Sequence, residues 1–160
     1  MEPVITLNLH MLDSAFAHEG WHGASLVPTL RKLSLEQLTD SDTYEGYTAW
    51  GIALHCAYWK YRARRRLIEI VLAEEPPKRF ERSPADWPDL PAERTRETWK
   101  RDLELLRNEH QLLKDVVSRL SVKLLVSPSP KTRKPMAGLI YGVAAHDAYH
   151  TAQIRNMGLL

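Results

Sequence analysis

The chain has 160 residues, 44% hydrophobic and 26% charged, which is enough apolar material for one compact domain with one core. Its 22 basic and 20 acidic residues are scattered and give a formal charge of only +2, which argues against a nucleic-acid-binding protein. The single cysteine, Cys56, excludes an internal disulfide and a multi-cysteine zinc site, so any bound metal must use histidine or carboxylate ligands.

A first helical segment is predicted over residues 9–33, because apolar residues recur there at alternating spacings of three and four. Pro28 lies within this segment and is expected to kink the helix or split it in two. Glu19 and His22 are three residues apart, so they are expected on one face of this helix.

A second helix is predicted over residues 47–73, with His55 on its buried face between Ile52 and Trp59. Residues 74–92 contain five prolines and predict a connection that is not helical throughout. At up to ~3.3 Å per residue this connection can span a helical bundle, which would make the second and third helices parallel.

A third helix is predicted over residues 99–124, where His110 falls on the buried face and is interpreted as a core histidine bonded to another helix. A fourth helix is predicted over residues 135–157, with His146 and His150 on its buried face. No strand pattern competes with these segments. The sequence therefore predicts an all-α four-helix bundle, with one domain over residues 1–160.

No apolar stretch approaches the roughly 18 residues that a membrane span needs, and the N-terminus lacks a basic region followed by an apolar run. We therefore expect a cytoplasmic protein with no membrane partner.

The histidines of the second and fourth helices carry the functional hypothesis. His146 and His150 lie four residues apart, so their side chains share one helix face and can converge on one metal ion. At ~1.5 Å per residue, antiparallel second and fourth helices would bring His55 to the same depth in the bundle. The alternatives are a hydrogen-bonded pair of core histidines and, for His55, an ordinary satisfied core residue.

Three blocks of the chain resemble one family: Trp21-His22-Gly23-Ala24-Ser25-Leu26, Leu54-His55-Cys56-Ala57-Tyr58-Trp59, and Ala145-His146-Asp147-Ala148-Tyr149-His150-Thr151-Ala152-Gln153-Ile154. Together they resemble the DinB-like (YfiT-like) superfamily of metalloenzymes. The resemblance implies an up-down-down-up four-helix bundle, with the proline-rich segment as the crossover, and a homodimer. It also implies that His55, His146 and His150 bind zinc, nickel or iron. Assigned activities in this family include thiol-dependent transfer and metal-dependent hydrolysis.

Further side chains are candidates for the site. His22 and Glu19 could act as a base, an extra ligand or a partner that orients a ligand; for His22 the alternative is a surface or capping role. Trp59, Arg62 and Tyr149 are candidates to bind substrate, with Arg62 attracting an anion. Solvent exposure of the arginine and plain core packing of the aromatics are the alternatives.

We therefore predict a divalent-metal-dependent enzyme that activates water or a low-molecular-weight thiol for attack on a small-molecule substrate. One alternative is a non-enzymatic metal-binding or dimerisation module. Another is a zinc peptidase, because His18, Glu19 and His22 match the H-E-x-x-H pattern, although Gly20 within it weakens a helix.

Overall fold

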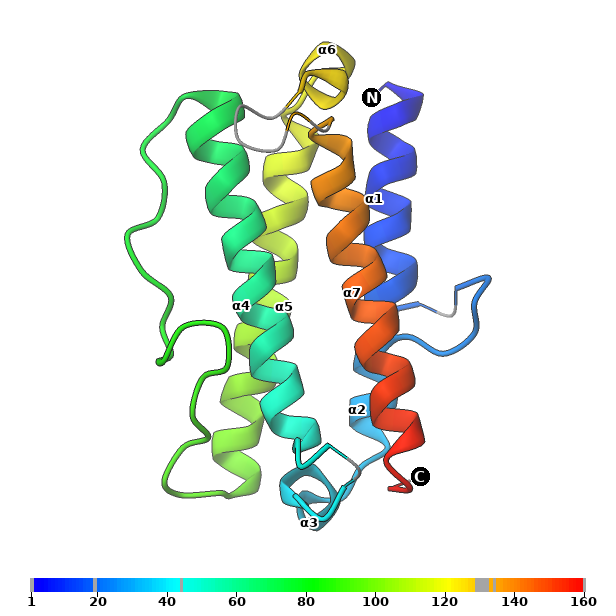
Figure 1. Cartoon of the computed structure of the whole chain (residues 1–160), viewed down its shortest axis with the longest axis vertical. Coiled ribbons are helices and arrows are strands. Elements are labelled where there is room, and N and C mark those ends of the chain that lie inside the picture. The colour runs from blue at the N-terminus through cyan, green and yellow to red at the C-terminus, as the bar shows by residue number, and fades with distance from the viewer. Residues whose placement is uncertain (1, 19, 44, 129–132, 134, 160) are drawn as a thin grey trace.

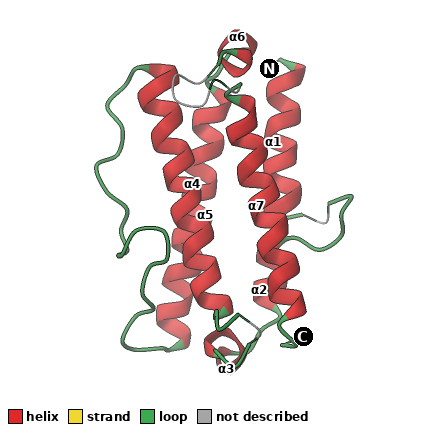
Figure 2. Ribbon diagram, viewed as in Figure 1, coloured by secondary structure: helices red, strands yellow, loops and turns green. Residues whose placement is uncertain are grey.

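The computed structural model describes residues 2–18, 20–43, 45–128, 133 and 135–159. Over these residues the fold is all-α, as predicted, with two isolated β-bridges and no strand (Figure 2). The helical elements are α1 (Pro3–Phe16), α2 (Leu26–Arg31), α3 (Leu35–Thr39), α4 (Ala49–Leu67), the π-helical turn η1 (Ile68–Leu72), α5 (Arg96–Ser118), α6 (Val122–Val126) and α7 (Ala137–Asn156).

Four long helices lie side by side, while α3 and α6 lie at opposite ends of the molecule (Figure 1). α4 packs against α5 and α7, and α1 packs against α7 and α5. In Figure 1, α4 and α5 run in one direction, whereas α1 and α7 run in the other. The antiparallel contact between α4 and α7 therefore brings the predicted histidine segments together. None of the described helices is both long and apolar enough to cross a membrane.

The helical segment predicted over residues 9–33 is interrupted, but the interruption does not lie at Pro28, where it was predicted. α1 ends at Phe16, and the chain makes a tight turn in which Gly20 and Gly23 exchange backbone hydrogen bonds of 3.1 and 2.9 Å. Gly23 adopts a φ of +98°, a conformation that glycine reaches without the steric cost of a side chain. His22 therefore lies in this turn and not on a helix.

Pro28 lies inside α2, as the third residue of that helix. The first turn of a helix has backbone N–H groups without an intrahelical partner, so the missing N–H of proline costs no helical hydrogen bond there. Pro28 consequently neither kinks nor ends the helix.

The second helix agrees closely with its prediction. The side chain of Thr48 caps the start of α4 by accepting a hydrogen bond of 2.9 Å from the backbone N–H of Gly51. The helix continues into η1, which ends where Ala73 takes a left-handed conformation with a φ of 55°. Residues 74–92 hold no helix and run along the outside of the bundle (Figure 1).

His110 is a buried histidine of α5 that joins two helices, as predicted. Its Nε2–H donates to Oδ1 of Asp13 on α1 at 2.9 Å, and its ring stacks on Phe16 with 3.7 Å between centroids. Nδ1 of His110 is buried with no hydrogen-bond partner among the described residues. A neutral ring suits this arrangement, because the unprotonated Nδ1 then needs no acceptor.

We expect His110 to make the protein less stable as the pH falls from 6.5 to 4. Burial lowers the pKa of His110 to about 4, although the hydrogen bond to Asp13 acts in the opposite direction. Between these pH values the unfolded chain binds a proton that the folded chain excludes, so the free energy of unfolding falls by up to about 3 kcal/mol. Urea unfolding of wild type and His110→Gln at several pH values above 4 measures this, since glutamine does not titrate. Equal pH slopes for the two proteins would contradict the expectation.

Candidate metal centre

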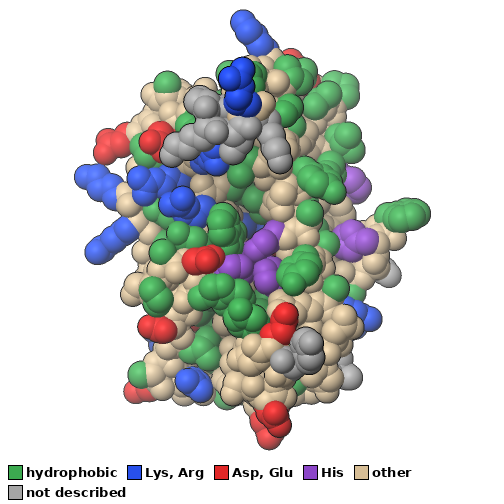
Figure 3. All heavy atoms as spheres, in the orientation of Figure 1, with side chains coloured by type: hydrophobic (Ala, Val, Ile, Leu, Met, Phe, Trp, Pro, Cys, Tyr) green, Lys and Arg blue, Asp and Glu red, His purple; other side chains and the backbone are tan. Residues whose placement is uncertain are grey.

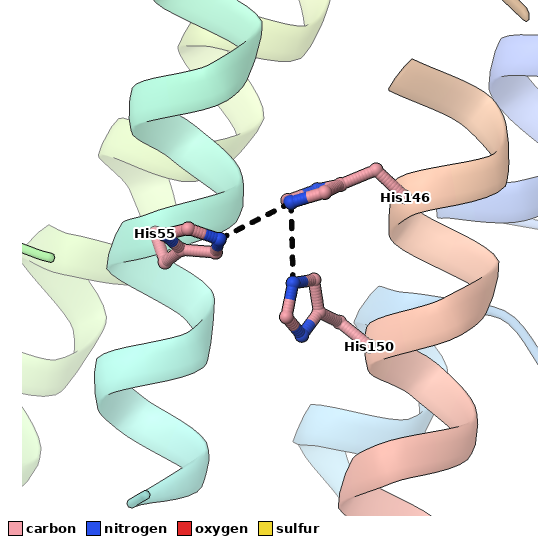
Figure 4. Close-up of side chains that lie close together, drawn as sticks. All are labelled: His55, His146 and His150. Carbon is pink, nitrogen blue, oxygen red and sulfur yellow. Dashed lines mark hydrogen bonds between the residues drawn. The ribbon is translucent and has the colours of Figure 1, made fainter. Parts of the chain in front are cut away.

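Three histidines from two helices converge on one point in the bundle (Figure 4). His55 comes from α4, and His146 and His150 come from successive turns of α7. The Nε2 atom of His146 lies 3.1 Å from Nε2 of His55 and 3.1 Å from Nε2 of His150. All three ligand atoms lie within 4.8 Å of one another, so the structure brings together the three residues of the predicted triad.

These separations suit imidazole ligands of a single ion. A zinc–nitrogen bond is about 2.0–2.1 Å long, so two nitrogens on a tetrahedral ion lie about 3.3 Å apart, close to the separations in this structure. The burial of the rings fits the same reading, because His55 and His150 are only 6% and 5% exposed. Buried imidazoles need polar partners, and a metal ion would satisfy all three at once.

Hydrogen bonds on the far side of two rings hold them in the orientation that a metal needs. The backbone carbonyl of Asp86 accepts from Nδ1 of His55 at 2.7 Å, and Oε1 of Gln153 accepts from Nδ1 of His150 at 2.7 Å. A proton on each Nδ1 leaves the Nε2 lone pairs directed at the centre. Without a metal, the Nε2 atoms of His55 and His150 would both be hydrogen-bond acceptors, and a single Nε2–H of His146 would have to serve both of them.

The three imidazoles are poised in the neutral form that binds metal. Burial is the main cause that lowers the pKa of His55 and of His150. For His146, burial together with the neighbouring His150, His55 and Lys60 lowers the pKa to about 3. Ligand nitrogens must be unprotonated to coordinate, so at neutral pH no proton has to leave His146 first.

The proline-rich connection contributes to the centre, which the sequence interpretation missed. The ring of Trp87 stacks on His55 with 3.8 Å between centroids and an interplanar angle of 12°. Nε1 of Trp59 donates to Oδ1 of Asp86 at 2.8 Å, which ties the connection to α4. No periodicity marks such contacts, and the only available signal was the aspartate–tryptophan pair in an otherwise proline-rich segment.

A buried ion pair lies directly behind the histidines. Nζ of Lys60 on α4 donates to Oδ2 of Asp147 on α7, and both side chains are fully buried. The other carboxylate oxygen, Oδ1 of Asp147, is buried without a partner among the described residues. The pair joins the two helices that carry the ligands, one residue away from His146. Sequence reasoning assigned no role to either residue.

A second group of potential ligand atoms, Cys56, His146 and Asp147, is a weaker candidate. Burial raises the pKa of the Cys56 thiol well above its ordinary value, which disfavours the thiolate that binds metals. The carboxylate of Asp147 is already engaged by Lys60. The three-histidine group is therefore the better metal site.

A cavity of about 720 Å³ opens beside the centre, with His55 and His146 in its wall together with Trp59 and Arg62. Its volume is within the range of small-molecule sites, about 300–1,000 Å³. Two of the three proposed ligands therefore face space that a substrate can reach.

The remaining candidates lie in different places. Tyr149 is 63% exposed, touches the edge of the His150 ring and lines a separate hollow of about 290 Å³. His22 is exposed and belongs to neither potential ligand group of the described residues. Glu19 lies outside the residues that the structure describes. His18 and His22 both follow the end of α1, so the helical H-E-x-x-H arrangement of a zinc peptidase is not formed.

The model of the DinB superfamily matches residues 20–154, a range that contains all three histidines of the centre. No curated protein and no solved structure matches the chain.

Proposed function

The chain belongs to the DinB superfamily, and on that premise we propose that it is a divalent-metal-dependent enzyme of hydrolase or thiol-dependent transferase type. His55, His146 and His150 are the proposed ligands. The observation that carries the proposal is the approach of three Nε2 atoms to one another beside a cavity of about 720 Å³. A purely structural metal site would have no need of such an opening.

Three imidazole ligands leave coordination positions of a metal open, as in catalytic sites. A divalent ion bound there would act as a Lewis acid and favour the deprotonated form of a water or a small thiol. Zinc and nickel are the proposed ions and iron is a further candidate, since imidazole suits all three.

The protein's own residues position the ligands and limit the access of water. The Asp86 carbonyl and the Gln153 amide oxygen hold the rings of His55 and His150. Trp87 covers one face of His55, and Trp59 stands in the wall of the cavity. A small-molecule electrophile would enter through this cavity and meet the nucleophile beside His146. The role of His22 stays a prediction.

We also propose that residues 1–160 form one domain with the up-down-down-up helix order and residues 74–92 as its crossover. The directions of the four long helices in Figure 1 support this order. A homodimer is proposed from the resemblance to the family, and a cytoplasmic location is proposed from the sequence.

The second candidate function is a non-enzymatic metal-binding or dimerisation module. The presence of the cavity beside the histidines favours an enzyme over such a module. The zinc-peptidase alternative is not proposed, because α1 ends before its motif begins.

The proposal is tested by metal analysis and by activity. Native protein purified without added metal is expected to carry one divalent ion per chain. A chelator should remove activity, and zinc, nickel or iron should restore it. The assays pair activated esters with water, and electrophiles with small thiols, for wild type and His55→Ala. We expect His55→Ala to lose at least about a hundredfold in rate. A metal-loaded protein that admits neither anions nor thiols would favour the non-enzymatic module.

A further inference from the structure

We propose that the cavity beside the histidines binds an elongated small molecule with a carboxylate or phosphate group at one end. The anionic end lies among the arginines of α4, and the other end lies at His55 and His146. This inference rests on the proposed function, because it identifies the substrate class of the same centre.

The cavity follows the contact between α4 and α7. On α7, Gly138, Gly142 and His146 line it and are spaced four residues apart, so they form one stripe along the helix. Apart from the local backbone of α7, a Cβ atom added at Gly138 or at Gly142 would meet no atom of the described residues within 4 Å. The two glycines therefore leave space open where side chains would otherwise stand.

The middle of the cavity is apolar. Ala63 and Ile70 of the α4–η1 segment and Leu139 and Val143 of α7 line it. A hydrocarbon portion of a ligand would bury apolar surface against these side chains, at roughly 25 cal/mol per Å².

Positive charge is concentrated at one end of the cavity. Arg62, Arg65 and Arg66 line it on α4, and Figure 3 shows basic side chains gathered to one side of the histidines on this face. Arg65 also donates to the Tyr61 hydroxyl at 3.4 Å. Arg62 has no hydrogen-bond partner among the described residues, so its guanidinium can turn to an incoming anion.

Two acidic residues also line the cavity, and only one of them, Glu69, lies near the arginines. Asp86 is at the histidine end, where its Oδ1 accepts from Trp59 and lies 3.3 Å from Nδ1 of His55. Glu69 contributes one negative charge, whereas the three arginines contribute three positive charges. A concave surface with a surplus of one charge attracts the opposite charge, and arginine binds carboxylate and phosphate through paired N–H groups.

The distance along α4 between His55 and the arginines determines the length of ligand that fits the cavity. Arg62 and Arg66 are seven and eleven residues after His55, which is roughly 10 and 16 Å along a helix. Helical side chains lean towards the N-terminus of their helix, so both guanidinium groups lean back towards His55. A chain of about six carbons between the two ends of the ligand fits this distance.

The test uses three probes with the same six-carbon thiol chain: 6-mercaptohexanoate, 6-mercaptohexyl phosphate and 6-mercaptohexanol. Calorimetry gives their dissociation constants for metal-free and cobalt-loaded protein, and the cobalt–thiolate absorption band reports contact of sulfur with the metal. We expect at least one anionic probe to bind about tenfold more tightly than the alcohol in both forms of the protein. Comparing the two anions identifies which group the site prefers.

Two sets of variants test the arginine charges and the open space beside the glycines of α7 separately. Arg62→Gln/Arg66→Gln is expected to bring the anion-to-alcohol ratio close to one without changing the affinity for the alcohol. Arg31→Gln removes an exposed charge on α2 and should keep the ratio. Gly142→Leu is expected to weaken all three probes about tenfold, whereas Ala145→Leu places the same side chain on the exposed face of α7 and should not.

Equal affinity of wild type for the alcohol and both anions would overturn the inference, as would an unchanged ratio in the double arginine variant. With cobalt bound, the absence of a cobalt–thiolate band would contradict the placement of the ligand's other end at His55 and His146. A clear anion preference in a protein that binds no cobalt would instead support the anion site and contradict the proposed function. A band without anion preference would do the opposite. Circular dichroism of each variant confirms that the helices are intact.

Discussion

Replacing His146 with alanine is expected to lower the affinity of the protein for zinc or nickel by about 10²–10³-fold, and His55→Ala and His150→Ala should do the same. The expectation follows from sharing a binding free energy of about 12 kcal/mol among three or four ligands, so that each contributes roughly 3–4 kcal/mol. His146 lies 3.1 Å from both other ligand atoms, which makes it the most informative position. Competition with a chromophoric chelator at pH 7.5 measures the change.

Two exposed histidines serve as controls for this experiment. His10 lies on the surface of α1 and His18 follows its C-terminal end, so alanine at either position should leave the affinity unchanged. His18 also tests the peptidase motif directly. A protein that lost its metal in His18→Ala but kept it in His146→Ala would show that the ion is bound elsewhere.

Replacing Lys60 with methionine is expected to reduce the free energy of unfolding by about 3–5 kcal/mol, the usual cost of leaving one charge of a buried pair without its partner. Methionine nearly matches the length of the lysine stem, so the loss comes mainly from the Asp147 carboxylate and from the cation–π contact of Lys60 with Phe16. Urea unfolding of metal-free protein at pH 7 measures it. Lys32→Met, on the surface, is the matched control and should change stability little.

The same variant should respond to pH in a defined direction. Burial raises the pKa of Asp147, and Lys60 opposes this rise in the wild type. Without Lys60 the folded chain holds a proton on Asp147 that the unfolded chain releases, so the stability deficit should shrink as the pH falls from 7 towards 5.

A second substitution removes the negative charge of Asp147 that Lys60→Met leaves without a partner. Lys60→Met/Asp147→Asn should recover part of the loss at pH 7, because an uncharged amide costs less to bury. A Lys60→Met protein as stable as wild type would mean that the pair contributes nothing to joining α4 and α7.

The periodicity of the sequence was sufficient to predict the long helices, because helix formation depends on local spacing of apolar residues. α4 and α7 lie where the alternating three and four spacing placed them. The third helix was predicted too long, because α5 ends at Ser118 and the separate short helix α6 follows it. The same local rule put His146 and His150 on one face and His55 on the buried face of the second helix, and the resemblance to the DinB superfamily implied that all three bind one metal.

The first segment shows where local spacing misleads. The alternating spacing continues from Phe16 to Leu26, but the described residues between them form no helix, because Gly20 and Gly23 close a turn there. The spacing of apolar residues does not reveal this turn, so the break was predicted at Pro28 instead. The first turn of α2 accommodates that proline.

The sequence by itself determined the helical class, the buried faces and which histidines could meet. The tertiary structure alone decided what surrounds them: Trp87 and Asp86 from an aperiodic connection, the pairing of Lys60 with Asp147, and the cavity between the glycines of α7 and the arginines of α4. These features join residues distant in the sequence, and their geometry depends on how the helices pack. The local periodicity of the sequence therefore does not predict such contacts.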